Sequence, residues 1–133
     1  FAPAVRSRIR VMPALSHAAV LRDFQQHDLL LATSLFEGFG TAVLEAMAAG
    51  LPVVASAVGA APDYIDNGRS GYLIEASDVD GFVSACTALI ESSAADRRVM
   101  IDAGMNAVVT LTWPVIARAT ADGYATVLTR VAE

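Results

Sequence analysis

Apolar residues follow two different spacings along this chain. Compact apolar runs of strand length lie at residues 28–32, 53–55 and 72–74, and an alternation of polar and apolar residues at 8–12 predicts a fourth strand. Apolar residues at helical spacing predict helices over residues 17–26, 41–49, 79–90, 94–111 and 113–131. Residues 62–65 add a single helical turn that begins at a proline.

Punctuating residues support these boundaries. Ser16 is a suitable N-cap for the helix after it, and Gly50 suits a left-handed C-terminal cap with Pro52 close behind. The expected buried residues of the helices share helical spacing and are Ala19, Val20, Phe24, Val43, Leu44, Met47, Val79, Phe82, Val83, Cys86, Leu89, Ile90, Val99, Met100 and Val108.

Strands that alternate with helices predict an α/β fold, a Rossmann-like parallel sheet flanked by helices. Such sheets bind ligands beyond the carboxyl ends of their strands. The loop at residues 33–40 follows the carboxyl end of a predicted strand. We therefore expect a binding site at this loop.

Composition narrows the classes of partner. The 133 residues carry a net charge of −5, which argues against nucleic acid, and all nine basic residues are arginines. Arg6, Arg8 and Arg10 fit the alternation of one strand face better than an anion site. The single cysteine, Cys86, is expected to be a buried inert thiol in a reducing cytoplasm.

Residues 37–45 place two carboxylates around a glycine-rich turn. Gly38 and Gly40 allow a ligand to approach the backbone closely, and the helix that follows offers free N–H groups and a favourable dipole to a diphosphate. Thr41 adds a hydroxyl, Glu37 can accept hydrogen bonds from a sugar, and Glu45 can accept both hydroxyls of a ribose. A surface carboxylate near a helix start is the simpler alternative for each glutamate.

The extended segment resembles the signature of the group 1 glycosyltransferases, which are retaining enzymes of the GT-B fold. Gly59, Gly68, Gly71 and Trp113 continue the family pattern. The residues that carry the resemblance are Thr33-Ser34, Glu37-Gly38-Phe39-Gly40, Glu45-Ala46-Met47-Ala48-Ala49-Gly50 and Pro52-Val53-Val54-Ala55-Ser56.

This resemblance implies a role for each matching residue. Glu37 is the expected catalytic residue and holds the donor sugar, and Glu45 binds the ribose hydroxyls. Donor contacts are also expected from Gly38, Phe39, Gly40, Thr41, Pro13 and Leu15, the last two beside the base. No cofactor and no metal are expected, and His17 and His27 are predicted to be helix-surface histidines rather than ligands.

The resemblance also implies that residues 1–133 are a single, incomplete C-terminal domain. The phosphate-binding arginine and lysine, two strands between residues 8–12 and the rest of the sheet, and the acceptor-binding N-terminal domain would all precede Phe1. Three alternatives then stay open for this piece: it loses its first strand from the sheet, borrows an edge from a second copy, or is marginally stable. Exposed sheet edges favour a homodimer. Pro13 replaces a usual glycine, and Ala60 and Asp63 replace a glycine and a glutamate.

The predicted function is donor binding for transfer of a hexosyl group from a nucleoside-diphosphate sugar to a glycan, lipid or small-molecule acceptor. The resemblance places such an enzyme in polysaccharide or glycolipid biosynthesis of the bacterial type, in the cytoplasm or peripheral to the inner membrane through the missing domain. Two alternatives stay open. A non-catalytic module would bind nucleotide sugars without transfer, and an assembly module would bind none.

Overall fold

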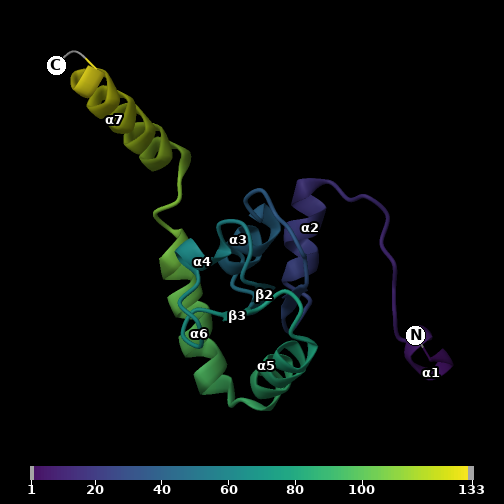
Figure 1. Ribbon diagram of the computed structural model, residues 1–133. Helices are drawn as coiled ribbons and strands as arrows, with labels where there is room; N and C mark the ends of the chain where they lie inside the picture. The colour runs from purple at the N-terminus through teal and green to yellow at the C-terminus, as the bar shows by residue number, and fades with distance from the viewer. Residues whose placement is uncertain (1, 132–133) are drawn as a thin grey trace.

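A computed structural model describes residues 2–131 and places three parallel strands in one sheet (Figure 1). The strands are β1 (Leu30–Ala32), β2 (Val53–Ser56) and β3 (Tyr72–Ile74), in the order β1-β2-β3. Leu31 pairs with Val54, which in turn pairs with Tyr72. The predicted strands at 28–32, 53–55 and 72–74 and their parallel arrangement are therefore confirmed.

Seven helices surround or extend from this sheet in the described part of the chain. The predicted helices are all present, with ends that differ by a few residues. Their bounds are α1 (Pro3–Arg6), α2 (His17–Phe24), α3 (Thr41–Ala48), α4 (Ala61–Tyr64), α5 (Val79–Glu91), α6 (Ala94–Val108) and α7 (Trp113–Val131).

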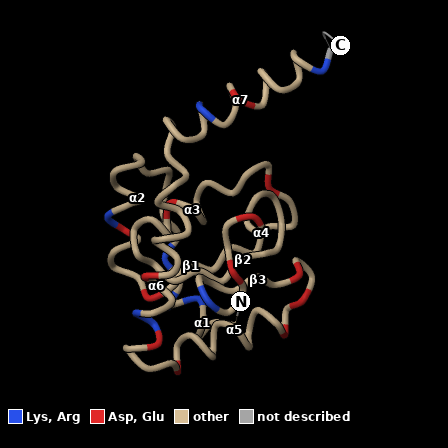
Figure 2. Tube along the Cα trace, turned by 90° about the vertical axis from the view of Figure 1, so that its left-hand side faces the viewer, with Lys and Arg blue, Asp and Glu red and all other residues tan. Residues whose placement is uncertain are grey.

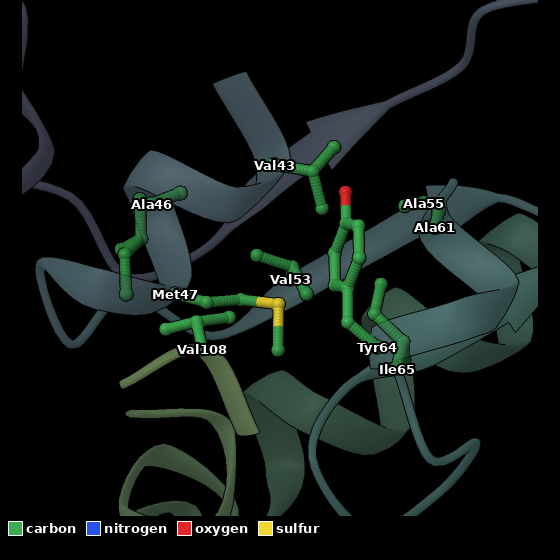
Figure 3. Packing of buried hydrophobic residues seen from close by; sticks show 10 residues of the cluster. Val43, Ala46, Met47, Val53, Ala55, Ala61, Tyr64, Ile65 and Val108 are labelled. Carbon is green, nitrogen blue, oxygen red and sulfur yellow. The ribbon is translucent and has the colours of Figure 1, made fainter. Parts of the chain in front are cut away.

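Strand β2 lies at the centre of the core. Val53 and Ala55 face a cluster built with α3, α4 and the end of α6, whereas Val54 faces a second cluster built with α5 and the middle of α6. Figure 3 shows the first cluster, in which Met47 lies beside Val53 and Val108. Because both faces of β2 are covered, the sheet is the middle of three layers.

Hydrogen bonds fix the ends of the helices that cover the sheet. Gly50, at φ +78, follows α3 in the left-handed conformation that the sequence predicts. The side chains of Asp78 and Ser93 cap α5 and α6 by accepting from the backbone N–H groups of Gly81 and Asp96. Arg97 donates to three carbonyl oxygens at the end of α5, those of residues 89, 90 and 92. These bonds join α5 to α6 at a defined corner.

The prediction of a strand at residues 8–12 is wrong for this structure. Residues 9–16 form no helix or strand and lead away from the sheet to α1 (Figure 1). A strand needs a neighbouring strand to satisfy its backbone N–H and C=O groups. Residues 8–12 do not pair with β1, the strand at the open edge of the sheet. Loss of this strand from the sheet is one of the outcomes that the resemblance leaves open, because it places two further strands between residues 8–12 and β1.

Several helix residues that were expected to be buried are exposed. On α5 the buried residues are Phe82, Ala85 and Leu89, which share a cluster with Val54 of β2. The other apolar residues of α5 that were expected inside, Val79, Val83 and Ile90, lie on a different side of the helix and are exposed. Val99 on α6 is also exposed, because the buried stripe runs along Met100, Gly104 and Val108. Only one stripe of each helix meets the core.

Helix α7 projects from the rest of the molecule. All of its described side chains are exposed, including the apolar Trp113, Ile116 and Leu128 (Figure 1). Charged residues are sparse along it, so most of the helix is tan in Figure 2. Within residues 2–131, no single helix has both the length and the apolar character to cross a membrane. Helices α6 and α7 reach that measure only as a pair bent by 47°.

We predict that Gly71→Ala destabilises the fold. A Cβ at this position would lie 2.7 Å from Val53 Cγ2 and 3.2 Å from the Val53 carbonyl oxygen, both parts of the buried strand. Overpacking of this kind costs about 1–3 kcal/mol. Chemical denaturation measures the free energy of unfolding.

The matched control is Gly123→Ala in α7, where a Cβ meets nothing within 4 Å. Alanine is the better helix former by up to about 1 kcal/mol, so this variant should unfold no earlier than the parent chain. Equal stability of the two variants would contradict the packing described for β2.

Candidate functional site

The candidate site lies where two parallel strands end. The loop at residues 33–40 joins the carboxyl end of β1 to α3, and residues 57–60 join the carboxyl end of β2 to α4. Parallel pairing of β1 with β2 brings these loops to the same edge of the sheet. This is the edge at which open α/β sheets bind ligands, as the sequence predicts.

Glu37 is held in place from two directions. Ser34 Oγ donates a hydrogen bond of 2.7 Å to Glu37 Oε1. From the other loop, Gly59 at φ +59 packs so closely that a Cβ there would lie 3.0 Å from Glu37 Cβ and 3.1 Å from the Phe39 carbonyl oxygen. Because Ala60 N–H also donates to Phe39 O, the two loops form one unit around Glu37. A small cavity of about 20 Å³ lies beside Glu37, lined by both loops and by the ends of β1 and β2.

The first turn of α3 is open to a ligand. Its N-cap, Gly40, has a left-handed backbone at φ +90 and provides no side-chain cap. The Gly40 carbonyl accepts a 3.2 Å hydrogen bond from the Tyr64 hydroxyl, whose ring lies 6.3 Å from that of Phe39. Uncapped N–H groups at a helix start attract anions. The contact of Gly40 and Thr41 with a diphosphate stays a prediction of the resemblance.

This environment changes the acidity of the Tyr64 phenol. Burial first, and then the nearby Glu37 carboxylate, raise the pKa of the Tyr64 phenol above its usual value of 10.0. The phenol therefore keeps its proton and donates to Gly40 O at neutral pH. The sequence did not mark Tyr64 as a site residue, because its hydroxyl reaches α3 only after the chain has folded.

Glu45 lies in the second turn of α3, and its side chain is about one third exposed (34%). Its Oε1 lies 3.6 Å from Nδ1 of His17, the first residue of α2. A groove of about 310 Å³ runs between the two helices beside this pair. His17 is a helix-surface histidine, as predicted, but its place next to Glu45 has no signal in the sequence, since 28 positions separate them.

The other predicted donor contacts fall into two groups, one beside Glu37 and one before α2. Gly38, Phe39 and Thr41 are exposed along the same loop and helix start as Glu37. Pro13 and Leu15 lie in the exposed segment before α2, so their contact with a base stays a prediction. Within residues 2–131, no group of three or more His, Cys, Asp or Glu side chains is arranged to hold a metal ion.

Cys86, outside the site, is half-buried in α5, and burial raises the pKa of its thiol. A thiol with a raised pKa forms less thiolate and is a poorer nucleophile. This agrees with the inert role expected from the sequence.

Comparison with known proteins decides the family. Residues 2–92 match the family model described as glycosyl transferases group 1. The chain belongs to the group 1 glycosyltransferases. A D-inositol 3-phosphate glycosyltransferase from Mycobacterium marinum is 36% identical over 110 residues, which are 82% of this chain and 24% of that protein. The protein of the same name from Mycobacterium tuberculosis is 34% identical over the same length. The chain thus spans about a quarter of these relatives.

Solved structures of glycosyltransferases share the GT-B fold with this chain. Sucrose-phosphate synthase from Thermosynechococcus elongatus superposes with a TM-score of 0.81 and 24% identity, over 96% of this chain and 32% of that one. A glycosyltransferase from Rickettsia africae gives 0.75 and 18% identity, over 94% and 33%. The C-terminal domain of a group 1 glycosyltransferase from Francisella tularensis gives 0.67 and 28% identity, over 75% and 51%.

We predict that Tyr64 makes the fold sensitive to alkali. A phenol pKa raised by folding means that the folded chain keeps a proton that the unfolded chain loses. The contribution of Tyr64 to stability is therefore complete below about pH 10 and is lost as pH rises through the folded pKa. Tyr64→Phe should flatten the decline in melting temperature between about pH 9 and pH 11. At neutral pH the same change should cost about 1 kcal/mol through the lost hydrogen bond.

Tyr124→Phe in the exposed α7 is the control, and it should leave the slope against pH as in the parent chain. If both variants follow the parent curve, the buried environment of Tyr64 described above is incorrect.

Proposed function

We propose that this chain is the donor-binding half of a retaining glycosyltransferase. It binds a nucleoside-diphosphate sugar, and the hexosyl group passes to a glycan, lipid or small molecule held by a domain outside these residues. The observation that carries the proposal is the uncapped start of α3 between Glu37 and Glu45, at the carboxyl edge of the sheet. Membership of a glycosyltransferase family supports it.

Each part of the donor has a matching group at this edge. N–H groups at the start of α3 bind the diphosphate and stabilise its charge as it leaves. Glu37, oriented by Ser34, accepts hydrogen bonds from the sugar hydroxyls. Glu45 accepts both hydroxyls of the ribose. The order along α3 and its loop, Glu37, then the helix start, then Glu45, follows the order sugar, diphosphate, ribose in the ligand.

Two carboxylates beside a diphosphate repel it, so cations must compensate. The chain has no lysine, and residues 33–56 contain no arginine. We infer that basic residues outside this chain complete the phosphate site in the whole enzyme. Relatives about four times as long have room for them. Such cations raise affinity, whereas the groups on α3 and its loop select the ligand.

A cytoplasmic location, a peripheral membrane contact, a metal-free reaction, and a role in polysaccharide or glycolipid synthesis stay predictions of the resemblance. The same holds for a homodimer through the edges of the sheet. None of these is needed for donor binding.

We predict that one nucleoside diphosphate and its sugar conjugate raise the melting temperature of this chain. A ligand that binds only the folded state stabilises it by about 2.7 kcal/mol at 100 times its Kd. The measurement is thermal unfolding against UDP, GDP and ADP and their glucose and mannose conjugates. If no nucleotide at any concentration shifts the transition, the chain does not bind donors and the proposal is wrong.

Substitution of the two glutamates should change ligand affinity in different ways. Glu45→Ala should weaken the nucleoside diphosphate and its sugar conjugate equally, because both carry the ribose. Glu37→Ala should remove only the extra affinity of the conjugate and leave the free diphosphate unchanged. Titration calorimetry with both ligands separates the two effects. Equal losses from the two variants would contradict the assignment of sugar to Glu37 and ribose to Glu45.

A further inference from the structure

The groove beside Glu45 carries polar side chains from both of the helices that line it. His17 begins α2, and that end of α2 lies on the same side of the sheet as the loop before α3 (Figure 1). The groove is lined on α2 by His17, Leu21 and Gln25 and on α3 by Glu45, Ala48 and Ala49. It therefore has apolar walls between the two helices and a facing imidazole and carboxylate.

The separation of this pair leaves both groups able to bind a ligand. His17 Nδ1 and Glu45 Oε1 are 3.6 Å apart, close enough to attract but too far for a direct hydrogen bond. The imidazole side chain is 65% exposed, so it can turn without disturbing the core. The carboxylate keeps its second oxygen free of this contact. A group placed at the pair can therefore contact both residues.

The chemistry of the pair matches that of a hydroxyl. A hydroxyl has one proton to donate and two lone pairs to accept, whereas a carboxylate only accepts and an imidazole can donate. A ribose hydroxyl can therefore donate to Glu45 and, at the same time, accept from a ring N–H of His17. An ether, a methylene group or a 2′,3′-dideoxyribose offers no such double contact.

We propose that His17 is a nucleoside-positioning residue that binds the ribose diol together with Glu45. This inference rests on the proposed function, since it assumes that a nucleotide occupies the site. It adds a specificity determinant from α2, so residues of two helices contact the ribose, rather than residues of α3 alone. The pair selects ribonucleotides over nucleotides that lack the diol.

The competing role for His17 is structural. An imidazole near Glu45 can simply moderate the charge of that carboxylate at the helix surface. Removal of His17 would then change the affinity for every nucleotide by the same factor. A double contact instead predicts a loss that depends on the hydroxyls of the ligand.

The test measures Kd for the nucleoside diphosphate that stabilises the parent chain and for its 2′,3′-dideoxy counterpart. His17→Ala should weaken the ribonucleotide about tenfold, the scale of one hydrogen bond to a polar ligand group, and the dideoxy form less than twofold. His17→Gln keeps an N–H donor and should recover part of the loss. His27→Ala is the matched control and should leave both Kd values unchanged, because His27 bonds the carbonyl of Asp23 near the other end of α2.

Proton NMR gives a readout that a structural role would not move. The chain has only two histidines, so the ring signals of His17 are identified by their loss in His17→Ala. Addition of the ribonucleotide should shift the His17 ring signals, and the dideoxy form should shift them much less. The His27 signals should stay in place with either ligand.

The outcomes separate this inference from the function on which it rests. If the parent chain binds a nucleotide but His17→Ala weakens both forms equally, or weakens neither, His17 is not a ribose contact and the proposed function still holds. If no nucleotide binds the parent chain, both proposals are wrong. A selective loss for the ribonucleotide, with ring shifts limited to His17, supports both.

Discussion

Burial of β2 on both faces is the constraint on which the other elements depend. Val53 and Val54 point to opposite sides of the sheet, and neither has any exposed surface. The first requires α3 and α4 above the strand, and the second requires α5 below it. A strand enclosed in this way cannot shift its register by one residue without turning its side chains to the wrong layer. The carboxyl end of β2 is thereby fixed, and so are the loops that begin there.

The position of the loops at the site depends on their packing against elements next to this fixed edge. Gly59 follows β2 and leaves room only for the backbone of residues 37–39 beside it. Tyr64, buried in the same cluster as Val53, reaches across to the carbonyl of Gly40. Both contacts carry the position of β2 to the start of α3. Core packing therefore fixes the backbone on both sides of Glu37, which lowers the cost of ordering this loop when a ligand binds.

The sequence predicted the parts of this arrangement that local signals control. Apolar runs located β1, β2 and β3, and Gly50 marked the end of α3, because spacing and backbone preference act within a few residues. The exposure of Val83 and Val99 was not predicted, since the side of a helix that meets the sheet depends on docking. The contacts of Tyr64 with Gly40 and of His17 with Glu45 join residues 24 and 28 positions apart. Such pairs follow from topology, which local patterns do not contain.

Helix α7 shows what lack of contact means for the thermodynamics of the chain. An isolated helix of this length in water is only marginally stable, because most helical stability in proteins comes from packing. Since its described side chains are exposed, α7 hides little apolar area that unfolding could newly expose. It therefore adds little to the heat capacity of unfolding and melts apart from the cooperative unit. The domain that unfolds as one body ends near Leu111, and α7, about a seventh of the chain, follows its own equilibrium.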